Sequence, residues 1–307
     1  MAAQQKGSAP ASTDSASPDS APNPDTLVID GHRVRFTHPD KVVFPQTGTT
    51  KADILDYYQR IAPLLLPLVT DRPATRKRWM HGTGGEPFFH KNLGDDTPEW
   101  VQRRPIQHDD HVNSYPLVND VATLAWFTQT AALEIHVPQW RFGSAGENAD
   151  PISPDTVRPD RMVFDLDPGP GAGLQDCATV ARLLRGRLAD LSFDPMPVTS
   201  GSKGIHLYAD LDGGRTADEV VELAHQLARD LETERPELVT SNIRKVNRDG
   251  RIFLDWSQNN ANKTTVSPYS LRGRARPMVA APRSWDEIDD PGVEQLDYLE
   301  VLRRAGL

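Results

Sequence analysis

One stretch decides the fold of this chain: residues 161–169, Arg161-Met162-Val163-Phe164-Asp165-Leu166-Asp167-Pro168-Gly169. Strand side chains alternate between two faces, so Asp165 and Asp167 project together while their apolar neighbours pack on the opposite side. The Pro-Gly pair is typical of a strand end. The sequence therefore predicts a strand buried on one face, with two carboxylates at its end on the other.

Two carboxylates on one face repel each other unless a cation lies between them, and oxygen-only ligands suit Mg²⁺ or Mn²⁺. Asp255 is the single acid near the end of a second apolar strand pattern, in residues 251–258. If Asp255 joins Asp165 and Asp167, three carboxylates can hold two ions roughly 3.5–4 Å apart, as in phosphoryl transfer. The alternatives are a solvent-facing strand end for the pair and an arginine-paired acid for Asp255.

Periodic patterns along the chain predict a mixed α/β protein without repeats. Apolar residues at helical spacing predict helices over about 51–65, 177–191 and 217–231, and Thr216 with Glu219 forms a capping-box pattern. Short apolar runs predict strands at 133–137, 162–167, 205–211 and 252–256.

Composition restricts the class of protein. Among 307 residues the single cysteine excludes a disulfide framework or a Cys-clustered zinc site. The longest apolar stretch, 61–69, contains two prolines and is too short for a membrane span, and the N-terminus lacks a signal-like apolar core. We therefore expect a soluble, cytoplasmic protein without membrane contact. Residues 1–26 lack Val, Ile, Leu and aromatic residues, which predicts a disordered tail.

The formal net charge of −9 argues at first against nucleic-acid binding, since phosphate contacts are made by Lys and Arg. However, residues 72–91 contain five Lys or Arg and one acid, and residues 241–276 contain eight against two. The chain is therefore predicted to be polarised, with two basic segments that are either one binding face or two solvated stretches.

A Gly/Ser-rich segment, Ser200-Gly201-Ser202-Lys203-Gly204, is the candidate phosphate loop. Its backbone N–H groups can approach a phosphate and Lys203 adds a positive charge, although a plain hairpin turn is the alternative. It is not a Walker loop, because Lys203 is followed by Gly204 and then by a strand pattern. His136 and His206, each on a predicted strand, read individually as hydrogen-bonded core histidines.

Taken together, eight ordered motifs resemble the polymerase domain of bacterial DNA ligase D and its stand-alone relatives, in the archaeo-eukaryotic primase superfamily. The resemblance covers roughly residues 27–300. The motifs are residues 47–58, 72–79, 88–89, 136–140, 164–169, 200–206, 253–259 and 269–274.

The resemblance implies an α/β (α+β) primase-polymerase fold. A catalytic RRM-like antiparallel sheet at 161–300 would pack with an N-terminal α/β part at 27–160 that contacts DNA and a 5′-phosphate, and 27–300 would form one compact unit. The implied activity is nucleotidyl transfer onto a primer 3′-OH at DNA breaks or short gaps, with two Mn²⁺ or Mg²⁺ ions and a preference for ribonucleotides. Such an enzyme would act in non-homologous end joining or gap filling.

The resemblance also assigns roles to residues. Asp165, Asp167 and Asp255 would be the catalytic metal ligands. The incoming nucleotide would be contacted by Lys77, His136, Ser200, Lys203, His206 and Arg272. The DNA contacts would be Lys41 and Lys51 on a 5′-phosphate, Phe88 and Phe89 on template bases, and Lys245 and Arg248 in a loop engaged in end synapsis.

The implied partners are DNA with a 5′-phosphorylated gap or break and an NTP or dNTP, with a DNA ligase and Ku as further candidates, in the cytoplasm at the nucleoid. The chain ends at Leu307 without a ligase or nuclease module, so it either serves a separately encoded ligase or is one domain of a larger protein. The rival functions are a DNA-end binding module without polymerase activity and a metal-dependent phosphoesterase.

Overall fold

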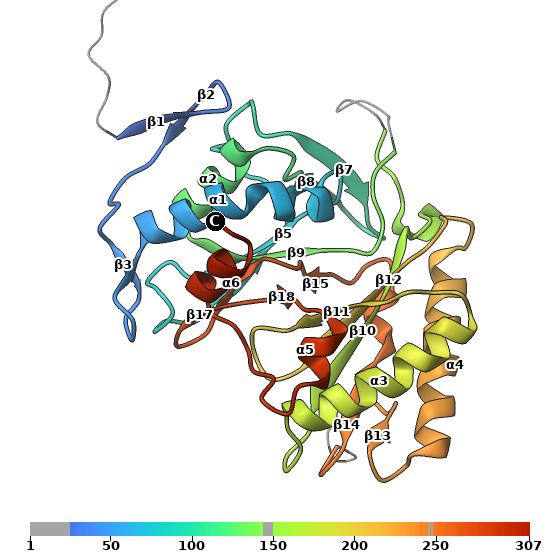
Figure 1. The fold of residues 1–307 in the computed structure, drawn as a ribbon. Coiled ribbons are helices and arrows are strands. Elements are labelled where there is room, and N and C mark those ends of the chain that lie inside the picture. The colour runs from blue at the N-terminus through green and yellow to red at the C-terminus, as the bar shows by residue number, and fades with distance from the viewer. Residues whose placement is uncertain (1–24, 144–149, 245, 247) are drawn as a thin grey trace, which may run out of the picture.

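The computed structural model describes residues 25–143, 150–244, 246 and 248–307 (Figure 1). Lys245 and residues 1–24 of the predicted tail lie outside these ranges, and the last residue of that tail, Thr26, is already the first of a strand. Within the described ranges, no helix is both long and apolar enough to cross a lipid bilayer.

The larger sheet has six strands and is antiparallel except for one parallel pair at its edge. Its core, β10-α3-β11-β12-α4-β14 with spatial order β14-β10-β12-β11, is a split βαββαβ arrangement, so the predicted RRM-like sheet is confirmed. In spatial order the strands are β13 (Val239–Thr240), β14 (Ile252–Asp255), β10 (Arg161–Pro168), β12 (Ile205–Asp210), β11 (Met196–Thr199) and β18 (Ala281–Pro282).

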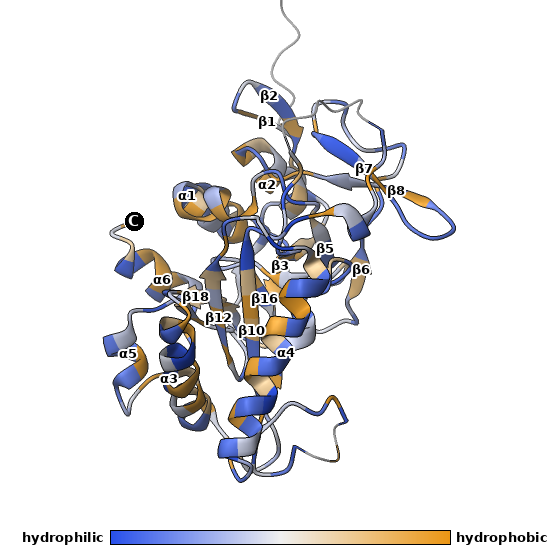
Figure 2. Ribbon diagram, turned by 90° about the vertical axis from the view of Figure 1, so that its right-hand side faces the viewer, coloured by the Kyte–Doolittle hydropathy of each residue, from blue (hydrophilic) through white to orange (hydrophobic). Residues whose placement is uncertain are grey.

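Two helices, α3 (Leu174–Asp190) and α4 (Ala217–Glu234), cover one face of this sheet (Figure 1). Phe164 and Leu166 of β10 are fully buried against them, as the alternation predicts. Thr216 caps α4 and forms a capping box with Glu219. Figure 2 shows hydrophilic and hydrophobic residues alternating along α4, because one side faces the sheet and the other faces solvent.

The smaller sheet contains β15 (Thr265–Val266), β9 (Ala132–Val137), β5 (Thr75–Arg78) and β6 (Phe88–His90), in that order. Its buried face packs with α1 (Lys51–Val69) and α2 (Val121–Gln129) in a second core. Thr50 caps α1 and forms a capping box with Asp53. The other faces of the two sheets meet, because Val163 and Tyr208 of the larger sheet pack with Val266 of the smaller one.

The remaining elements are hairpins and short helices around the two sheets. They are β1 (Thr26–Ile29) and β2 (His32–Arg35), β3 (Val42–Phe44) and β4 (Thr49–Thr50), β7 (Arg103–Gln107) and β8 (Val112–Pro116), β16 (Leu271–Gly273) and β17 (Pro277–Val279), η1 (Pro154–Thr156), η3 (Trp256–Asn259), α5 (Trp285–Asp289) and α6 (Tyr298–Arg304).

The C-terminal residues return to the first part of the chain. Leu271, Val279 and Val301 are buried in the core around α1 and α2, and β15 pairs with β9. Strand pairing and core packing therefore connect residues on both sides of the predicted boundary at residue 160. The division into an N-terminal and a catalytic part stays a prediction.

The predicted strand at 252–256 ends one residue early. Asp255 is the last residue of β14, and its side chain accepts a hydrogen bond from Ser257 N at 3.0 Å, which begins η3 at Trp256. A carboxylate that caps a turn competes with continuation of the strand.

Asn259, at the end of η3, extends the sheet with its side chain. Its Oδ1 accepts from Val163 N and its Nδ2 donates to Val163 O, both at 2.8 Å, so the amide replaces a strand partner for β10. Because Asn259 is buried, no water can take over these bonds. The turn that carries Asp255 is thereby tied to the strand that carries Asp165.

We expect Asn259→Ala to lower the free energy of unfolding by about 2–4 kcal/mol, since it leaves two buried backbone groups without partners. Chemical denaturation measures this loss. The control is Asn262→Ala at a neighbouring exposed asparagine, for which we expect a change below about 0.5 kcal/mol. Equal effects of the two substitutions would contradict the proposed role of the amide.

Candidate active site

The carboxylates lie together because of strand register. Asp165 is paired with His206 of β12 on one side and with Asp255 of β14 on the other. All three, together with Asp167, project from the sheet face opposite α3 and α4, because the alternate residues of these strands are in the helix-covered core. The three predicted metal ligands are therefore neighbours on one surface.

Ionisation of Asp165 and Asp167 is unfavourable in the folded protein, because the carboxylates are partly removed from water and repel each other. Burial, and then repulsion by Asp255, raise the pKa of Asp165 to about 7. Repulsion by Asp165, and then burial, raise the pKa of Asp167 to about 6. His206 Nε2 lies 3.4 Å from Asp165 Oδ1, but burial lowers the pKa of this histidine to about 3, so it adds little positive charge.

Asp255 is adjacent to the pair but directs its oxygens elsewhere. Its Oδ1 accepts from Ser257 N and Oγ, and its Oδ2 accepts from Gln258 Nε2 at 2.8 Å. In the part of the chain that the structure describes, no group of three or more His, Cys, Asp or Glu side chains is arranged to hold a metal ion. The predicted three-carboxylate cluster is thus present as neighbours but not as a preformed set of ligands.

The chemistry of this surface nevertheless fits a divalent cation. The repulsion between the ionised carboxylates of Asp165 and Asp167, which contributes to their raised pKa values, is relieved when a divalent cation binds between them. Oxygen donors are the ligands that Mg²⁺ and Mn²⁺ prefer. Asp165 and Asp167 therefore fit such an ion, and Asp255 is near enough to contribute to their repulsion.

The facing surface, on the smaller sheet, is cationic. Lys77 of β5 and His136 of β9 project from one face of their sheet, and Arg272 of β16 lies beside them. These three predicted nucleotide contacts converge on one buried carboxylate, Glu134, which is 1% exposed. Burial alone would raise the pKa of Glu134, but the hydrogen bond with His136 and the charges of Arg272 and Lys77 hold it well below its usual range.

Arg272 connects the two surfaces. Its Nη1 donates to Ser200 O, and its charge opposes the upward shift of the pKa of Asp165. The close contact needs Gly201, which has φ +67°, because a Cβ there would lie 2.6 Å from Arg272 Cγ. A single guanidinium thus lies between Glu134 and the paired aspartates.

The candidate phosphate loop is the turn between β11 and β12. Ser200 Oγ accepts hydrogen bonds from Ser202 N and Gly204 N, and Lys203 is exposed at the tip. From the C-terminal segment, Gln295 accepts from Gly201 N at 2.6 Å and donates to Gly204 O at 3.0 Å. The loop is therefore a hairpin turn, held at both ends by one amide side chain.

Lys41 and Lys51 line one cavity of about 150 Å³ between α1, α2 and the β3 region. Lys51 is buried and donates to Thr37 O and Gln129 Oε1, and burial, followed by the charges of Lys41 and Arg35, lowers its pKa to about 8. Lys41 is exposed and donates to Met80 O at 2.8 Å. The structure thus brings these two predicted contacts together.

The predicted stacking residues Phe88 and Phe89 are 43% and 56% exposed on β6. Phe89 meets the His136 ring edge-on, with ring centroids 5.3 Å apart, so it borders the cationic surface, while Phe88 projects to the opposite face of β6 and packs with Arg78. Arg248 packs over the ring of Phe253 at 3.6 Å and its charge opposes the upward pKa shifts of Asp165 and Asp167. In this structure Arg248 therefore lies beside the carboxylates, while Lys245 is outside the described residues.

Sequence reasoning missed Glu134 and Gln295. Glu134 precedes His136 by two residues on a predicted strand, so the same alternation that pairs Asp165 with Asp167 could have placed it on the histidine's face. Gln295 carries no such signal, because it lies in a loop far along the chain.

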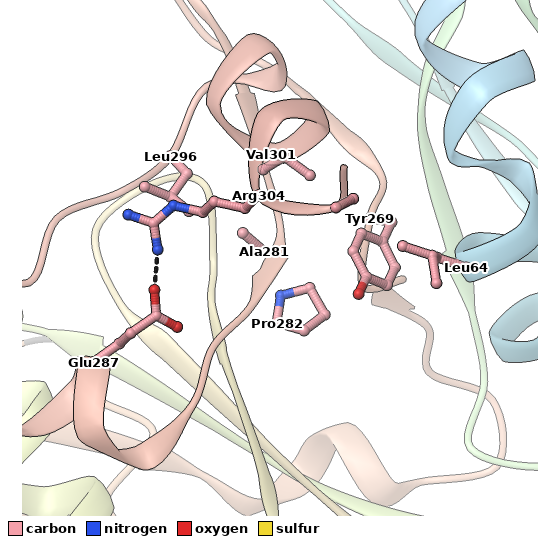
Figure 3. Close-up of a pocket in the computed structure, with 9 residues that line it drawn as sticks. Leu64, Tyr269, Ala281, Pro282, Glu287, Leu296, Val301 and Arg304 are labelled. Carbon is pink, nitrogen blue, oxygen red and sulfur yellow. Dashed lines mark hydrogen bonds and ion pairs between the residues drawn. The ribbon is translucent and has the colours of Figure 1, made fainter. Parts of the chain in front are cut away.

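A cavity of about 350 Å³ beneath α5 and α6 contains none of the predicted site residues (Figure 3). Its charged groups, Glu287 and Arg304, pair with each other.

The acidic surface of the larger sheet faces the cationic surface of the smaller one, and comparison with known proteins shows the family to which a chain with this arrangement belongs. The model of the primase-polymerase domain of LigD matches residues 50–306. The chain therefore belongs to the LigD primase-polymerase domain family, a family of metal-dependent DNA nucleotidyltransferases. The fold class expected from the sequence is confirmed.

Individual relatives support this membership. The multifunctional non-homologous end joining DNA repair protein LigD of Mycobacterium tuberculosis H37Rv is 49% identical over 276 residues, which cover 89% of this chain and 35% of the relative. The bifunctional non-homologous end joining protein LigD of Bacillus subtilis is 32% identical over 89% of this chain and 43% of the relative. The chain thus spans less than half the length of these relatives.

A solved structure is also similar. It is the polymerase domain from Mycobacterium tuberculosis ligase D in complex with DNA, with a TM-score of 0.84 and 48% identity. The match covers 89% of this chain and 94% of that one.

We expect Asp165→Asn to stabilise the metal-free protein by roughly 1–3 kcal/mol at pH 8, since it removes a half-buried charge that Asp255 and Asp167 repel. The pKa in the folded state is raised, so the ionised carboxylate costs stability above about pH 7 and the gain shrinks as pH falls toward about 4. Denaturation with a chelator at several pH values measures it. Asp190→Asn, at an exposed acid, is the control, and a gain that does not change with pH would contradict the assignment.

Proposed function

We propose that this chain extends primer 3′-OH ends at DNA breaks or short gaps by metal-dependent nucleotidyl transfer, favouring ribonucleotides, as part of end joining or gap filling in DNA repair. The observation that supports this most strongly is the placement of Arg272. It joins the acidic surface of Asp165 and Asp167 to the cationic surface around Glu134. A triphosphate and the hydroxyl that attacks it need these two kinds of surface side by side.

In the proposal, Asp165, Asp167 and Asp255 hold two divalent ions, either Mn²⁺ or Mg²⁺. When bound, the ions would acidify the primer 3′-OH and stabilise the pyrophosphate leaving group. In the metal-free protein, the mutual repulsion of the carboxylates lowers the free energy of unfolding. Asp255 has to exchange its hydrogen bonds with Ser257 and Gln258 for metal coordination, so we expect local rearrangement of η3 on binding.

The nucleotide is proposed to lie between the sheets. Lys77 and Arg272 neutralise phosphate charge, and Lys203 at the loop tip adds a further cation. His136 and Ser200 are proposed to contact the same nucleotide. His206, which is neutral at pH 7, can donate or accept a hydrogen bond next to Asp165.

The DNA is proposed to lie across the smaller sheet and α1. The cavity that Lys41 and Lys51 share fits a 5′-phosphate, because two amines and no acid line it. Phe88 and Phe89 offer exposed rings for template bases. Lys245 and Arg248 would act in a loop that engages a second DNA end. A DNA ligase and Ku are proposed partners, since the similar proteins are named as end-joining proteins.

We expect Asp167→Ala to abolish primer extension, at least about a thousandfold, because the ion next to the 3′-OH loses a ligand. The assay uses a gapped duplex with a 5′-phosphate, Mn²⁺ and either rNTPs or dNTPs. Binding of the duplex should change less than about threefold, since DNA phosphates are bound by Lys and Arg and a carboxylate contributes no positive charge to that binding.

The control is Asp210→Ala, at an exposed acid on β12 beyond the site, which should extend primers at the wild-type rate. Near wild-type extension by Asp167→Ala would contradict the metal assignment. Duplex binding by a wild-type protein that does not extend primers would favour a DNA-end binding module instead.

The preference for a 5′-phosphate is expected to decline as pH rises through about 8. The pKa of Lys51 is lowered to about 8, so above this pH the amine becomes neutral and no longer attracts the phosphate. The measurement is the ratio of affinities for phosphorylated and unphosphorylated gapped DNA from about pH 7 to about pH 9.5. Lys51→Gln should give a small ratio with no inflection near pH 8. A wild-type ratio that stays constant over this range would contradict the role of Lys51.

A further inference from the structure

The cationic surface is built around one carboxylate that faces no solvent. Glu134 Oε2 lies 2.8 Å from His136 Nε2 and 3.8 Å from Lys77 Nζ. Glu134 Oε1 lies 3.4 Å from Arg272 Nε and accepts a hydrogen bond from Gly273 N at 3.0 Å. One oxygen therefore contacts residues of β5 and β9 and the other contacts residues of β16, so the carboxylate joins elements that are distant in the sequence.

With these contacts made, Glu134 is not free to bind a ligand directly. At 1% exposure it lies beneath the cations and cannot itself touch a ligand on the open surface. A carboxylate only accepts hydrogen bonds, so its bond to His136 places the hydrogen on Nε2 and fixes the orientation of that ring. A buried charge persists only when it is paired, and the cations of Lys77 and Arg272 supply that pairing together with the hydrogen bond from His136.

We propose that Glu134 is a positioning residue for triphosphate binding: it holds Lys77, His136 and Arg272 in one convergent arrangement before the nucleotide arrives. This inference rests on the proposed nucleotide site. Preorganised cations avoid paying the entropy of ordering long side chains at the moment of binding. The effect extends to the phosphate loop, because the guanidinium that Glu134 holds also donates to Ser200 O.

A merely local charge effect predicts the opposite result. Glu134 is an anion beneath the site, so if it acted only through its field, its removal would strengthen the binding of an anionic ligand. Positioning predicts that removal weakens binding, because Lys77 and Arg272 then repel each other and lose their fixed orientation. The sign of the change therefore separates the two accounts.

The test is binding of inorganic tripolyphosphate, without metal or DNA, measured by titration calorimetry. Glu134→Gln keeps the shape and removes the charge, and we expect its Kd to rise about tenfold or more. The matched control is Asp160→Asn, which also removes a carboxylate paired with two arginines, Arg72 and Arg141, but away from the site. Its Kd should stay within about twofold of wild type. An unchanged or lower Kd for Glu134→Gln would overturn the inference.

A double substitution tests whether Glu134 acts through Arg272. If it does, the loss of affinity in Glu134→Gln with Arg272→Gln should be smaller than the sum of the two single losses, because the contact that joins the two side chains is lost only once. Fully additive losses would overturn the inference. Should Glu134→Gln fail to fold, Glu134→Asp replaces it, because the shorter side chain keeps the charge but cannot reach both His136 and Gly273. Its Kd should be intermediate, and a wild-type value would count against positioning.

Primer extension separates this inference from the proposed function. In extension assays Glu134→Gln should raise KM for the nucleotide more than it lowers kcat. If wild type binds tripolyphosphate in a Glu134-dependent way but extends no primer, the proposed function fails and the inference stands. If the wild type and Glu134→Gln extend primers with equal KM for the nucleotide, the inference about Glu134 fails and the proposed function stands.

Discussion

The structure depends on how one guanidinium is held between two sets of acids. Arg272 lies 3.4 Å from Glu134 on the smaller sheet, and its charge also reaches Asp165 on the larger one. Each carboxylate would be costly to bury by itself, and the arginine offsets part of the cost on both sides. The two sheets can therefore face each other across a polar site while their outer faces bury separate apolar cores.

The sequence predicted much of the acidic surface and little of its surroundings. Alternation along residues 161–169 correctly placed Asp165 and Asp167 on one face, and the apolar run at 252–256 correctly placed Asp255 in a strand. Both inferences rest on local periodicity, which a single sequence contains. The family likeness to LigD polymerase domains was confirmed by the match to the family model and by the similar solved structure.

What escaped prediction depends on contacts between distant residues. Asp255 caps η3 rather than pointing to the paired aspartates, because Ser257 and Gln258 compete for its oxygens. Glu134 acquires its role only once β16 is packed beside β9, and Gln295 only once the C-terminal segment returns to the β11–β12 turn. Spacing within one segment contains no information on such pairings, so the sequence named the charged residues without showing what orients them.

The acidic surface of β10 is proposed to be the metal site of a nucleotidyltransferase. Anomalous diffraction from crystals soaked with Mn²⁺ and a non-hydrolysable nucleotide tests it most directly. We expect manganese peaks in contact with Asp165 and Asp167, with the Asp255 carboxylate turned away from Ser257 to join them. Peaks only at other acids, with Asp255 still capping η3, would contradict it.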